Sequence, residues 1–321
     1  MSAGPSPCPP DRPLNNMFDF DKFEEVSPWN HLFDWGVLPA DRESEIPDAK
    51  TVAAVSAFLQ KPTQQPFFCA AGLYKPHLPW YAPQRFFDLY PLDQVSLPFV
   101  KDDDLEDVPE IARSWAQSPP DHETVLKHGQ WRHAVQAYLA AISYCDSMIG
   151  QLLDALDASP HRDNTIIALW GDNGFHLGEK LHWRKFVLWE EATRVPFIVV
   201  PPTGVQSVAR SNEPVSLVDL FPTICDLAGL DLINGVDGIS QKPAVCGEAT
   251  APDRPAVMTW KPGNHSIRWE HWRYTRYHDG SEELYDLHSD PFEWTNLATE
   301  PRFGEILTQM QKQMDLAVIC Q

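Results

Sequence analysis

The sequence predicts an α/β fold, in which a largely parallel sheet flanked by helices is followed by a small C-terminal subdomain of antiparallel strands and a helix. The chain has 321 residues, of which 43% are hydrophobic, so it can bury a large core. Short apolar runs of strand length alternate with segments of helical periodicity, as in α/β domains. After about Pro252 the runs become short and aromatic with intervening turns, which is typical of an antiparallel meander.

The larger domain is expected to cover residues 1–249, and it begins with a Pro-rich, acidic segment that we interpret as an extended arm over residues 1–47. Asp48 can cap a helix that extends to about Leu59, because the apolar side chains of this segment fall on one face. Residues 67–73 form a short apolar run, which predicts a buried strand that leads into a rigid loop.

The middle of the chain contains the clearest periodicity. Residues 91–130 are expected to be mostly loop, whereas residues 131–157 repeat apolar side chains at helical spacing and predict a long helix. Two more buried strands are predicted over residues 165–170 and 195–200, and a helix over residues 216–227. Ligands of such α/β sheets bind at the carboxyl ends of the strands, so polar residues at these ends are candidates for a site.

The C-terminal subdomain is expected to cover residues 250–321. Its short aromatic runs and turns predict an antiparallel meander followed by a helix. The predicted strands cover residues 256–260, 266–269, 272–277 and 283–286, and the helix covers about residues 301–317.

The balance of charges limits the classes of partner. The chain has 25 Lys and Arg residues against 45 Asp and Glu residues, and its net charge is −20. Such a protein repels nucleic acid and anionic membranes, and it attracts divalent cations. An anionic substrate would therefore need a local cluster of cations. The acidic run Asp102–Asp104 resembles a metal site, although a solvated loop is the favoured interpretation.

The stretch with the most candidate metal-binding and anion-binding residues follows the predicted strand over residues 165–170. Asp172 and Asn173 stand between two glycines at the end of this strand, where they can offer two oxygen ligands to a hard cation. Arg184 and Lys185 come about a dozen residues later and suit an oxyanion bound beside the metal. The alternative for the Gly-Asp-Asn-Gly stretch alone is an ordinary tight turn.

A second candidate group follows the predicted strand over residues 67–73. Lys75 and His77 lie beside prolines, so the directions of their side chains are fixed by rigid backbone. A histidine in this position can protonate a leaving group or bind an anion. The alternative is a histidine on an ordinary surface loop.

Several motifs, in the same order along the chain, resemble the bacterial sulfatases of the iduronate-2-sulfatase-like group, within the alkaline-phosphatase-like superfamily. The likeness extends from about Phe33 to Leu297, and the motifs together are highly specific. They are Pro66-Phe67-Phe68, Tyr74-Lys75-Pro76-His77-Leu78-Pro79, Asp172 to Glu179, Trp183-Arg184-Lys185, Glu190 to Pro196, Pro214 to Thr223, Glu283-Leu284-Tyr285-Asp286 and Asp290 to Leu297.

This resemblance implies a calcium-dependent hydrolase of sulfate esters, with sulfated sugars as the expected substrates. It implies that Asp172 and Asn173 are Ca²⁺ ligands and that His77 and Lys185 contact the sulfate. The remaining candidates for substrate binding are Lys75, His182 and Arg184. We expect all these side chains to converge on one cleft.

The family cleaves the ester with a formylglycine that is made from Cys or Ser in a C-x-P-S-R motif. Cys8-Pro9-Pro10-Asp11-Arg12 only superficially imitates this motif, because it has Asp in place of Ser. We therefore expect the chain to be truncated at its N-terminus and inactive as it stands, with residues 1–249 representing the C-terminal portion of the catalytic domain.

Two alternatives to a sulfatase stay open at the level of sequence. One is a phosphoester or phosphonate hydrolase of the same superfamily, and the other is a non-catalytic remnant that binds anions or glycans. Residues 1–13 have no apolar stretch of the kind a signal peptide needs, and no apolar run is long enough to span a bilayer. We expect a soluble chain, although members of the resembled family are often periplasmic or secreted.

Overall fold

The computed structural model describes residues 33–208, 210–248 and 254–319, and it divides the chain into two compact units. The first unit contains Met1–Leu97 and Glu123–Asp163, and the second contains Pro98–His122 and Asn164–Gln321. The predicted boundary between residues 249 and 250 lies inside the second unit and stays a prediction. Most of the predicted arm, and Cys8 with its imitation of the family motif, lie outside the described residues.

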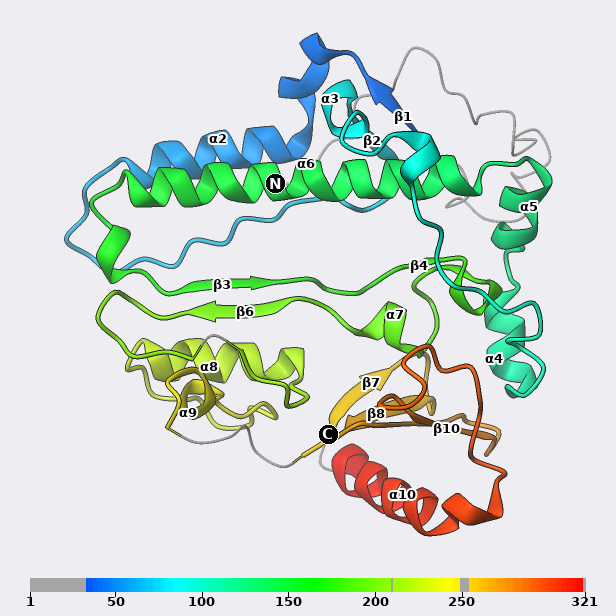
Figure 1. Ribbon diagram of the computed structural model, residues 1–321. Helices are drawn as coiled ribbons and strands as arrows, with labels where there is room; N and C mark the ends of the chain where they lie inside the picture. Colours follow the sequence, from blue (N-terminus) through cyan, green and yellow to red (C-terminus); the bar gives the residue numbers. More distant parts are fainter. Residues whose placement is uncertain (1–32, 209, 249–253, 320–321) are drawn as a thin grey trace. The chain divides into compact units, whose positions relative to one another are not determined.

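The first unit is built around one long helix. Helix α6, Trp131–Asp157, is the helix predicted over residues 131–157, and helix α2, Pro47–Leu59, lies alongside it (Figure 1). The buried face of α6 carries small residues and a few large ones, which lets neighbouring elements approach closely: Ala134, Val135, Ala137, Ala140, Ala141, Tyr144, Met148 and Leu156. The remaining regular elements here are β1 Trp35–Leu38, β2 Trp80–Pro83, α3 Gln84–Phe87 and the 3₁₀ turns Ala40–Glu45, Leu92–Gln94 and Arg162–Asn164.

Strands β1 and β2 form a parallel pair that the sequence did not reveal. Trp35 is opposite Trp80, and both indole rings are buried and stacked with centroids 5.9 Å apart. We predicted an arm and a loop here, because each strand has only four residues and contains or adjoins proline. The pairing stabilises both short strands through tertiary contacts that no local pattern encodes.

The prediction of a buried strand over residues 67–73 is wrong. This stretch has no regular secondary structure, Phe68 is 79% exposed, and Cys69 is exposed rather than in the core. A strand needs a partner for its backbone groups, and within the described ranges no strand pairs with this run. Lys75 and His77 therefore precede strand β2 instead of following a strand.

The start of helix α2 also differs from the prediction. Asp48 does not cap the helix: Ile46 occupies the cap position and Pro47 begins the first turn. The carboxylate of Asp48 is buried and instead accepts hydrogen bonds from the backbone N–H groups of Tyr74 and Lys75, at 2.7 and 3.0 Å. Asp48 thus fixes the start of the proline-rich loop that carries His77.

The second unit contains the two strands predicted over residues 165–170 and 195–200, but the prediction that they are buried is wrong, because Trp170, Ile198 and Val200 are exposed. Strand β3, Ile167–Trp170, pairs with β6, Phe197–Val200, and the pair is antiparallel rather than parallel. The chain returns from β3 to β6 through a folded loop whose only α-helix is the four-residue α7, Glu190–Thr193, which is too short for the crossover that parallel strands need. The other elements of this part are β4 His176–Leu177, β5 Trp183–Arg184, and helices α4 Glu110–Ala116, α8 Leu220–Leu227 and α9 Lys242–Val245. Helix α5, Asp121–Lys127, begins in this unit with Asp121 and His122 and continues in the first unit from Glu123.

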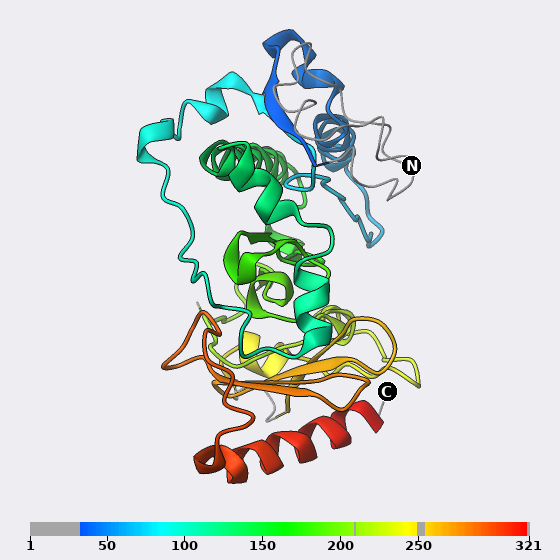
Figure 2. The ribbon, with the colours of Figure 1, turned by 90° about the vertical axis from the view of Figure 1, so that its right-hand side faces the viewer.

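The predicted meander is confirmed strand by strand. The antiparallel sheet has the order β10–β9–β8–β7, and helix α10 runs along one face of it (Figure 2). Met310 and Met314 of the helix are fully buried against Ile267, Tyr274 and Leu284 of the sheet. The bounds are β7 Ala256–Thr259, β8 His265–Trp269, β9 Trp272–Arg276, β10 Glu282–Asp286 and α10 Gly304–Ile319, preceded by a 3₁₀ turn over Pro301–Phe303.

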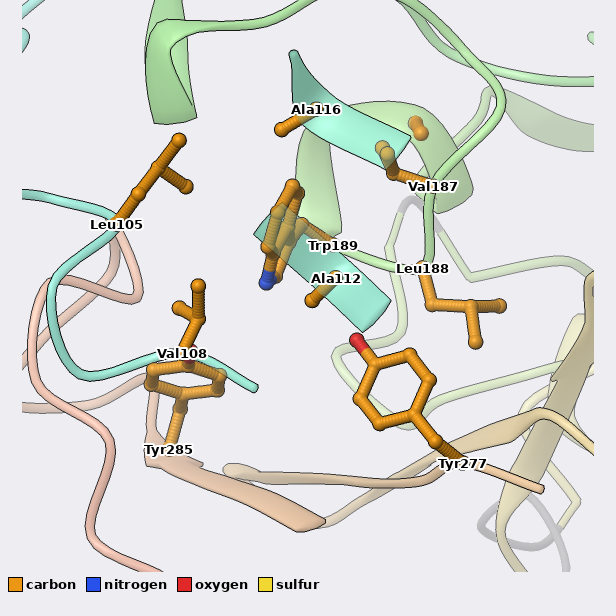
Figure 3. Close-up of a cluster of buried hydrophobic side chains, with 10 residues drawn as sticks. Leu105, Val108, Ala112, Ala116, Val187, Leu188, Trp189, Tyr277 and Tyr285 are labelled. Carbon is orange, nitrogen blue, oxygen red and sulfur yellow. The ribbon is translucent and has the colours of Figure 1, made fainter. Parts of the chain in front are cut away.

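A second hydrophobic cluster joins three distant parts of the second unit. The segment Pro98–His122, the loop over residues 171–190 and the meander all contribute side chains, and the indole of Trp189 lies among them (Figure 3). The members of the cluster are Leu105, Val108, Ala112, Ala116, Val187, Leu188, Trp189, Ala192, Tyr277 and Tyr285. The loop that carries the candidate site is therefore anchored in a core. Among the described helices, none is long and apolar enough to cross a membrane.

Candidate active site

The carboxyl end of strand β3 carries Asp172 and Asn173. Asp172 is exposed, and within the described residues its carboxylate has no hydrogen bond or ion pair. The side-chain amide nitrogen of Asn173 donates to the carbonyl of Gly174 at 2.7 Å. The side-chain oxygen of Asn173 is therefore left to accept a hydrogen bond or to coordinate a cation. Two oxygen atoms of adjacent residues are thus available at the strand end.

Gly174 is required by the close approach of two backbone segments. A Cβ atom at this position would lie 2.0 Å from the carbonyl oxygen of Glu191, which is far inside any allowed contact. The N–H of Gly174 also donates to the carbonyl of Ala192 at 2.9 Å. The turn that presents Asp172 and Asn173 is therefore pinned to the start of helix α7.

Strands β4 and β5 return the chain towards this turn. His176 is opposite Arg184 and Leu177 is opposite Trp183, so Lys185 directly follows the last paired residue of the hairpin. Lys185 is half-buried, and its ammonium group has no hydrogen bond or ion pair among the residues described. Lys185 is thus a cation that has no acidic partner in the described structure.

Arg184, the neighbouring cation, already has a carboxylate partner. Its Nε donates to Oδ2 of Asp121 at 2.5 Å, its Nη2 donates to Oδ1 at 3.3 Å, and both residues are buried. The charge of Arg184 is thereby balanced inside the protein, and its predicted contact with substrate stays a prediction. The sequence does not predict Asp121 as the partner of Arg184, because 63 residues separate the two and no local motif marks Asp121.

Lys180 is paired in the same manner. Its ammonium donates to Oδ1 of Asp104 at 2.8 Å and to the backbone carbonyl of Glu293, and both ion-pair side chains are 2% exposed. The interpretation of the acidic run Asp102–Asp104 as a solvated loop is therefore wrong for Asp104. Across the described parts of the chain, no three His, Cys, Asp or Glu side chains are grouped to hold a metal.

His182 is buried with its imidazole packed against that of His176, with ring centroids 5.3 Å apart. Nδ1 of His182 donates to the carbonyl of Ala116 at 2.9 Å, and Nε2 of both rings has no hydrogen-bond partner within the described structure. Burial lowers the pKa of His182 to about 4, and it lowers the pKa of His176 well below its usual value. His182 is therefore neutral at physiological pH, and its predicted contact with substrate stays a prediction.

The buried imidazole of His182 leads to an expected dependence of stability on pH. In the unfolded chain the pKa of His182 returns to about 6.5. Between about pH 6.5 and about pH 4 the unfolded state therefore binds a proton that the folded state does not bind. The free energy of unfolding should therefore fall as the pH drops from about 6.5 to about 4, by up to about 3 kcal/mol from this group.

Urea unfolding at about pH 7.5 and about pH 5 measures this loss. The variant His182→Asn keeps an N–H donor for Ala116 at the position of Nδ1 but has no titrating group, so its stability should fall less between the two pH values. An equal fall in variant and wild type would show that His182 does not contribute.

Lys75 and His77 belong to the first unit. Lys75 is 3% exposed, its ammonium donates to the carbonyl of Pro79, and burial lowers its pKa to about 8. Nδ1 of His77 donates to the carbonyl of Leu78 at 2.7 Å, which fixes the orientation of the imidazole ring. Their convergence with Asp172, in the other unit, stays a prediction.

One pocket lies on the Pro98–His122 side of the loop over residues 171–190. It encloses about 460 Å³, and its lining mixes two carboxylates, a guanidinium, an amide and leucine side chains. The lining residues are Asp102, Leu105, Glu106, Arg113, Gln117 and Leu181. Arg113 is engaged with the backbone carbonyls of Leu105, Glu106 and Val108, so the free groups of the pocket are mainly acceptors.

Comparisons with known proteins show the family and the fold of the chain. A family model described as Sulfatase matches residues 11–230, and one described as N-sulphoglucosamine sulphohydrolase, C-terminal, matches residues 178–318. A sulfatase of Formosa agariphila is 38% identical over 272 residues, which are 84% of this chain and 53% of that protein. A Delta 4,5-hexuronate-2-O-sulfatase of Bacteroides thetaiotaomicron is 28% identical over 326 residues, which are 94% of this chain and 66% of that protein.

A solved phosphonate monoester hydrolase of Agrobacterium radiobacter has the same fold. It superposes with a TM-score of 0.74 at 18% identity, over 97% of this chain and 70% of that one. The predicted fold class, α/β of the alkaline phosphatase and sulfatase type with a C-terminal antiparallel sheet, is thereby confirmed. The chain spans about half to two thirds of the length of the two curated relatives. Because the Sulfatase model matches well over half of its residues, this chain belongs to the sulfatase family.

Proposed function

We propose that this chain carries the metal and anion site of a calcium-dependent hydrolase that acts on the sulfate esters of sugars. The observation that carries this proposal is the strand-end turn with two available oxygens, followed through the β4–β5 hairpin by a lysine that has no acidic partner among the described residues. Membership of the sulfatase family supports sulfate esters as the substrate class. The printed name of one relative, a hexuronate-2-O-sulfatase, supports a sulfated sugar.

Asp172 and Asn173 are the residues that would hold Ca²⁺. A carboxylate and an amide oxygen are ligands that hard cations prefer, and neither oxygen is engaged elsewhere in the described structure. Ca²⁺ takes about six to eight oxygens, so these two residues would supply a minority of them. When bound, the ion would withdraw charge from the oxygens of the ester and stabilise the charge that develops during cleavage.

Lys185 and His77 are proposed to contact the sulfate group. The ammonium of Lys185 supplies a positive charge that no carboxylate of the described residues neutralises, so it is free to bind an oxyanion. His77 can donate a proton from Nε2 when its imidazole is charged, as a general acid does for a leaving group. Lys75 and His182 stay secondary candidates, because both are buried and bonded to backbone carbonyls.

The residues present do not fit a formylglycine. The sequence contains no C-x-P-S-R motif, and its cysteines stand in other contexts. The proposed role of the residues present is therefore to bind and polarise the ester. A second candidate function is the hydrolysis of phosphonate monoesters, which is favoured by the fold match to such an enzyme.

Titration calorimetry on the purified chain tests the metal and anion sites separately. Ca²⁺ is titrated first, and sulfate and methylphosphonate are then titrated in the presence of Ca²⁺. Asp172→Ala should lower the Ca²⁺ affinity about tenfold or more, because it removes the only charged ligand among the two. Lys185→Ala should leave the Ca²⁺ affinity unchanged and lower the sulfate affinity about tenfold or more, since it removes a charged hydrogen bond.

Matched controls use residues of the same charge elsewhere in the second unit. Asp231→Ala and Lys312→Ala change exposed side chains and should leave both affinities unchanged. Equal Ca²⁺ binding by wild type and Asp172→Ala would exclude Asp172 as a ligand. Tighter binding of methylphosphonate than of sulfate, with the same dependence on Lys185, would favour the second candidate function.

A further inference from the structure

We propose that Asp121 is a positioning residue that sets the direction of Lys185, because it holds the preceding residue, Arg184, in a strained backbone conformation. This inference rests on the proposed role of Lys185 as the anion contact. The segment Pro98–His122 would then have a specific task, which is to hold the loop over residues 171–190 in the shape that presents Lys185.

The first observation is a concentration of backbone strain. Lys180, Leu181 and Arg184 have φ values of 55°, 48° and 82°, a region that favours glycine and disfavours residues with a Cβ atom. Three such residues within five positions is unusual, and conformations of this kind persist only where the surrounding structure enforces them. Strain of this type clusters at functional sites, where it fixes a side chain in a required direction.

The second observation is the identity of the groups that enforce the strain. Arg184 is held by two hydrogen bonds to Asp121, at 2.5 and 3.3 Å, and Lys180 is held by Asp104 at 2.8 Å. Both aspartates come from the segment Pro98–His122, and all four side chains are buried. Each strained cation thus has its own buried carboxylate. A two-point contact fixes the orientation of a guanidinium as well as its position.

The pairing has a consequence for charge. Between residues 180 and 185 the chain carries three permanently basic side chains, and the two strained ones are neutralised by aspartates. The histidine between them is uncharged, since burial lowers its pKa to about 4. Over the described residues, Lys185 is therefore the one basic side chain of this stretch without an acidic partner. An anion that approaches the loop meets a single defined positive charge.

The third observation is the covalent position of Lys185 between two fixed points. Arg184 precedes it, and Val187, Leu188 and Trp189 follow it in the buried cluster (Figure 3). Nε1 of Trp189 donates to Glu283 at 2.8 Å, which fixes the far end as well. Only Lys185 and Phe186 lie between these anchors. If Asp121 releases Arg184, the strained backbone can relax, and Lys185 loses its direction.

Asp121→Asn is the primary test, because it keeps the shape and one acceptor but removes the charge. In the purified chain with Ca²⁺ present, its sulfate affinity should fall about tenfold, comparable to the loss in Lys185→Ala. Amide hydrogen exchange of residues 184–186 should become about tenfold faster or more, as expected for local release of a held segment. Both measurements are made where thermal unfolding shows that the variant is folded.

Asp104→Asn is the matched control. It breaks an equally buried ion pair with an equally strained cation, but this cation lies five residues from Lys185. Its stability should fall to a similar extent, whereas its sulfate affinity should stay within about twofold of wild type, because Lys180 is not the residue that precedes Lys185 in the chain. Equal losses of affinity in the two variants would mean that the pairs only stabilise the fold, and the inference would be wrong.

Other outcomes separate this inference from the proposed function. If Lys185→Ala binds sulfate like wild type, the proposed anion site fails, and the exchange of residues 184–186 still reports whether Asp121 holds the loop. If Asp121→Asn binds sulfate more tightly, Asp121 only neutralises Arg184 and does not position Lys185. Should Asp121→Asn not fold, Arg184→Lys keeps the charge and loses the two-point contact, and it should lower the sulfate affinity about threefold or more.

Discussion

Replacing Gly174 by alanine is expected to destabilise the second unit and to abolish measurable Ca²⁺ binding at the strand end. The added Cβ atom would lie 2.0 Å from the carbonyl oxygen of Glu191 and 3.1 Å from that of Arg194. Both of these oxygens are backbone atoms, and the N–H of Gly174 donates a hydrogen bond to the carbonyl of Ala192. Neither backbone segment can therefore shift without breaking other contacts. Overpacking of this kind costs about 1–3 kcal/mol or more, and it displaces the turn that presents Asp172 and Asn173.

Gly238→Ala supplies a matched control for this prediction. Its Cβ atom would lie 1.9 Å from the carbonyl oxygen of Val218, so the clash is as severe, but it is located beside helix α8 and not at the strand end. Urea unfolding should show similar losses of stability, and calorimetry should show normal Ca²⁺ affinity for Gly238→Ala alone. A Gly174→Ala protein with wild-type stability and affinity would mean that the turn is not pinned as described.

The sequence predicts best those elements whose signal is local and repeated. Helix α6 is 27 residues long, and its apolar face repeats often enough that no other periodicity fits it. The meander is marked by turns at Asp279-Gly280 and by aromatic residues, and the four predicted strands agree with the observed ones to within one or two residues. The strand-end position of Asp172 and Asn173 also follows from local pattern, since an apolar run directly precedes them.

Predictions fail where the deciding contact lies far away in the sequence. Residues 67–73 are as apolar as a buried strand, yet the run is exposed, because burial depends on a partner that the run does not specify. Strands β1 and β2 have four residues each and contain or adjoin proline, and they form because two buried indoles meet across 45 residues of chain. Short strands depend on their neighbours more than on their own composition.

The partners of the cations in the site were missed for the same reason. Asp104 and Asp121 lie 76 and 63 residues before Lys180 and Arg184, and no motif links them. In the sequence, Arg184 and Lys185 are equivalent neighbours, and both suit an oxyanion. The fold distinguishes them, because one is buried with a carboxylate and the other is not. Assigning a ligand to a cation therefore requires knowledge of which acids already neutralise it.

Replacing Arg273 by methionine is expected to be the most destabilising change in the meander. Arg273 of strand β9 is 1% exposed, and its guanidinium lies against Glu190 and, at 2.9 Å, against Glu293. It also donates to the carbonyl of Leu188 at 3.0 Å, so it joins the meander to the loop that carries Lys185. Removing one partner of a buried ion network leaves uncompensated charge and costs about 3–5 kcal/mol.

Two comparison variants test the physical cause of this loss. Arg276→Met, three residues along the same strand, breaks an exposed pair with Asp315 and should cost at most about 1 kcal/mol. The triple change Arg273→Met, Glu190→Gln and Glu293→Gln removes the orphaned charges with their partner and should recover most of the stability that Arg273→Met loses. A triple variant no more stable than Arg273→Met would show that the loss comes from packing rather than from buried charge.

The dependence of stability on pH also distinguishes uncompensated buried charge from loss of packing. Burial raises the pKa of Glu293 to about 7 even with Arg273 beside it, and loss of the guanidinium can only raise it further. A carboxylate whose pKa is raised on folding contributes stability below its unfolded pKa of about 4.5, and this contribution is lost as the pH rises through the folded pKa. The difference in unfolding free energy between Arg273→Met and wild type should therefore be largest near pH 8 and should shrink towards pH 5, as measured by urea unfolding. A difference that does not change over this range would mean that both carboxyl groups find other partners when Arg273 is removed.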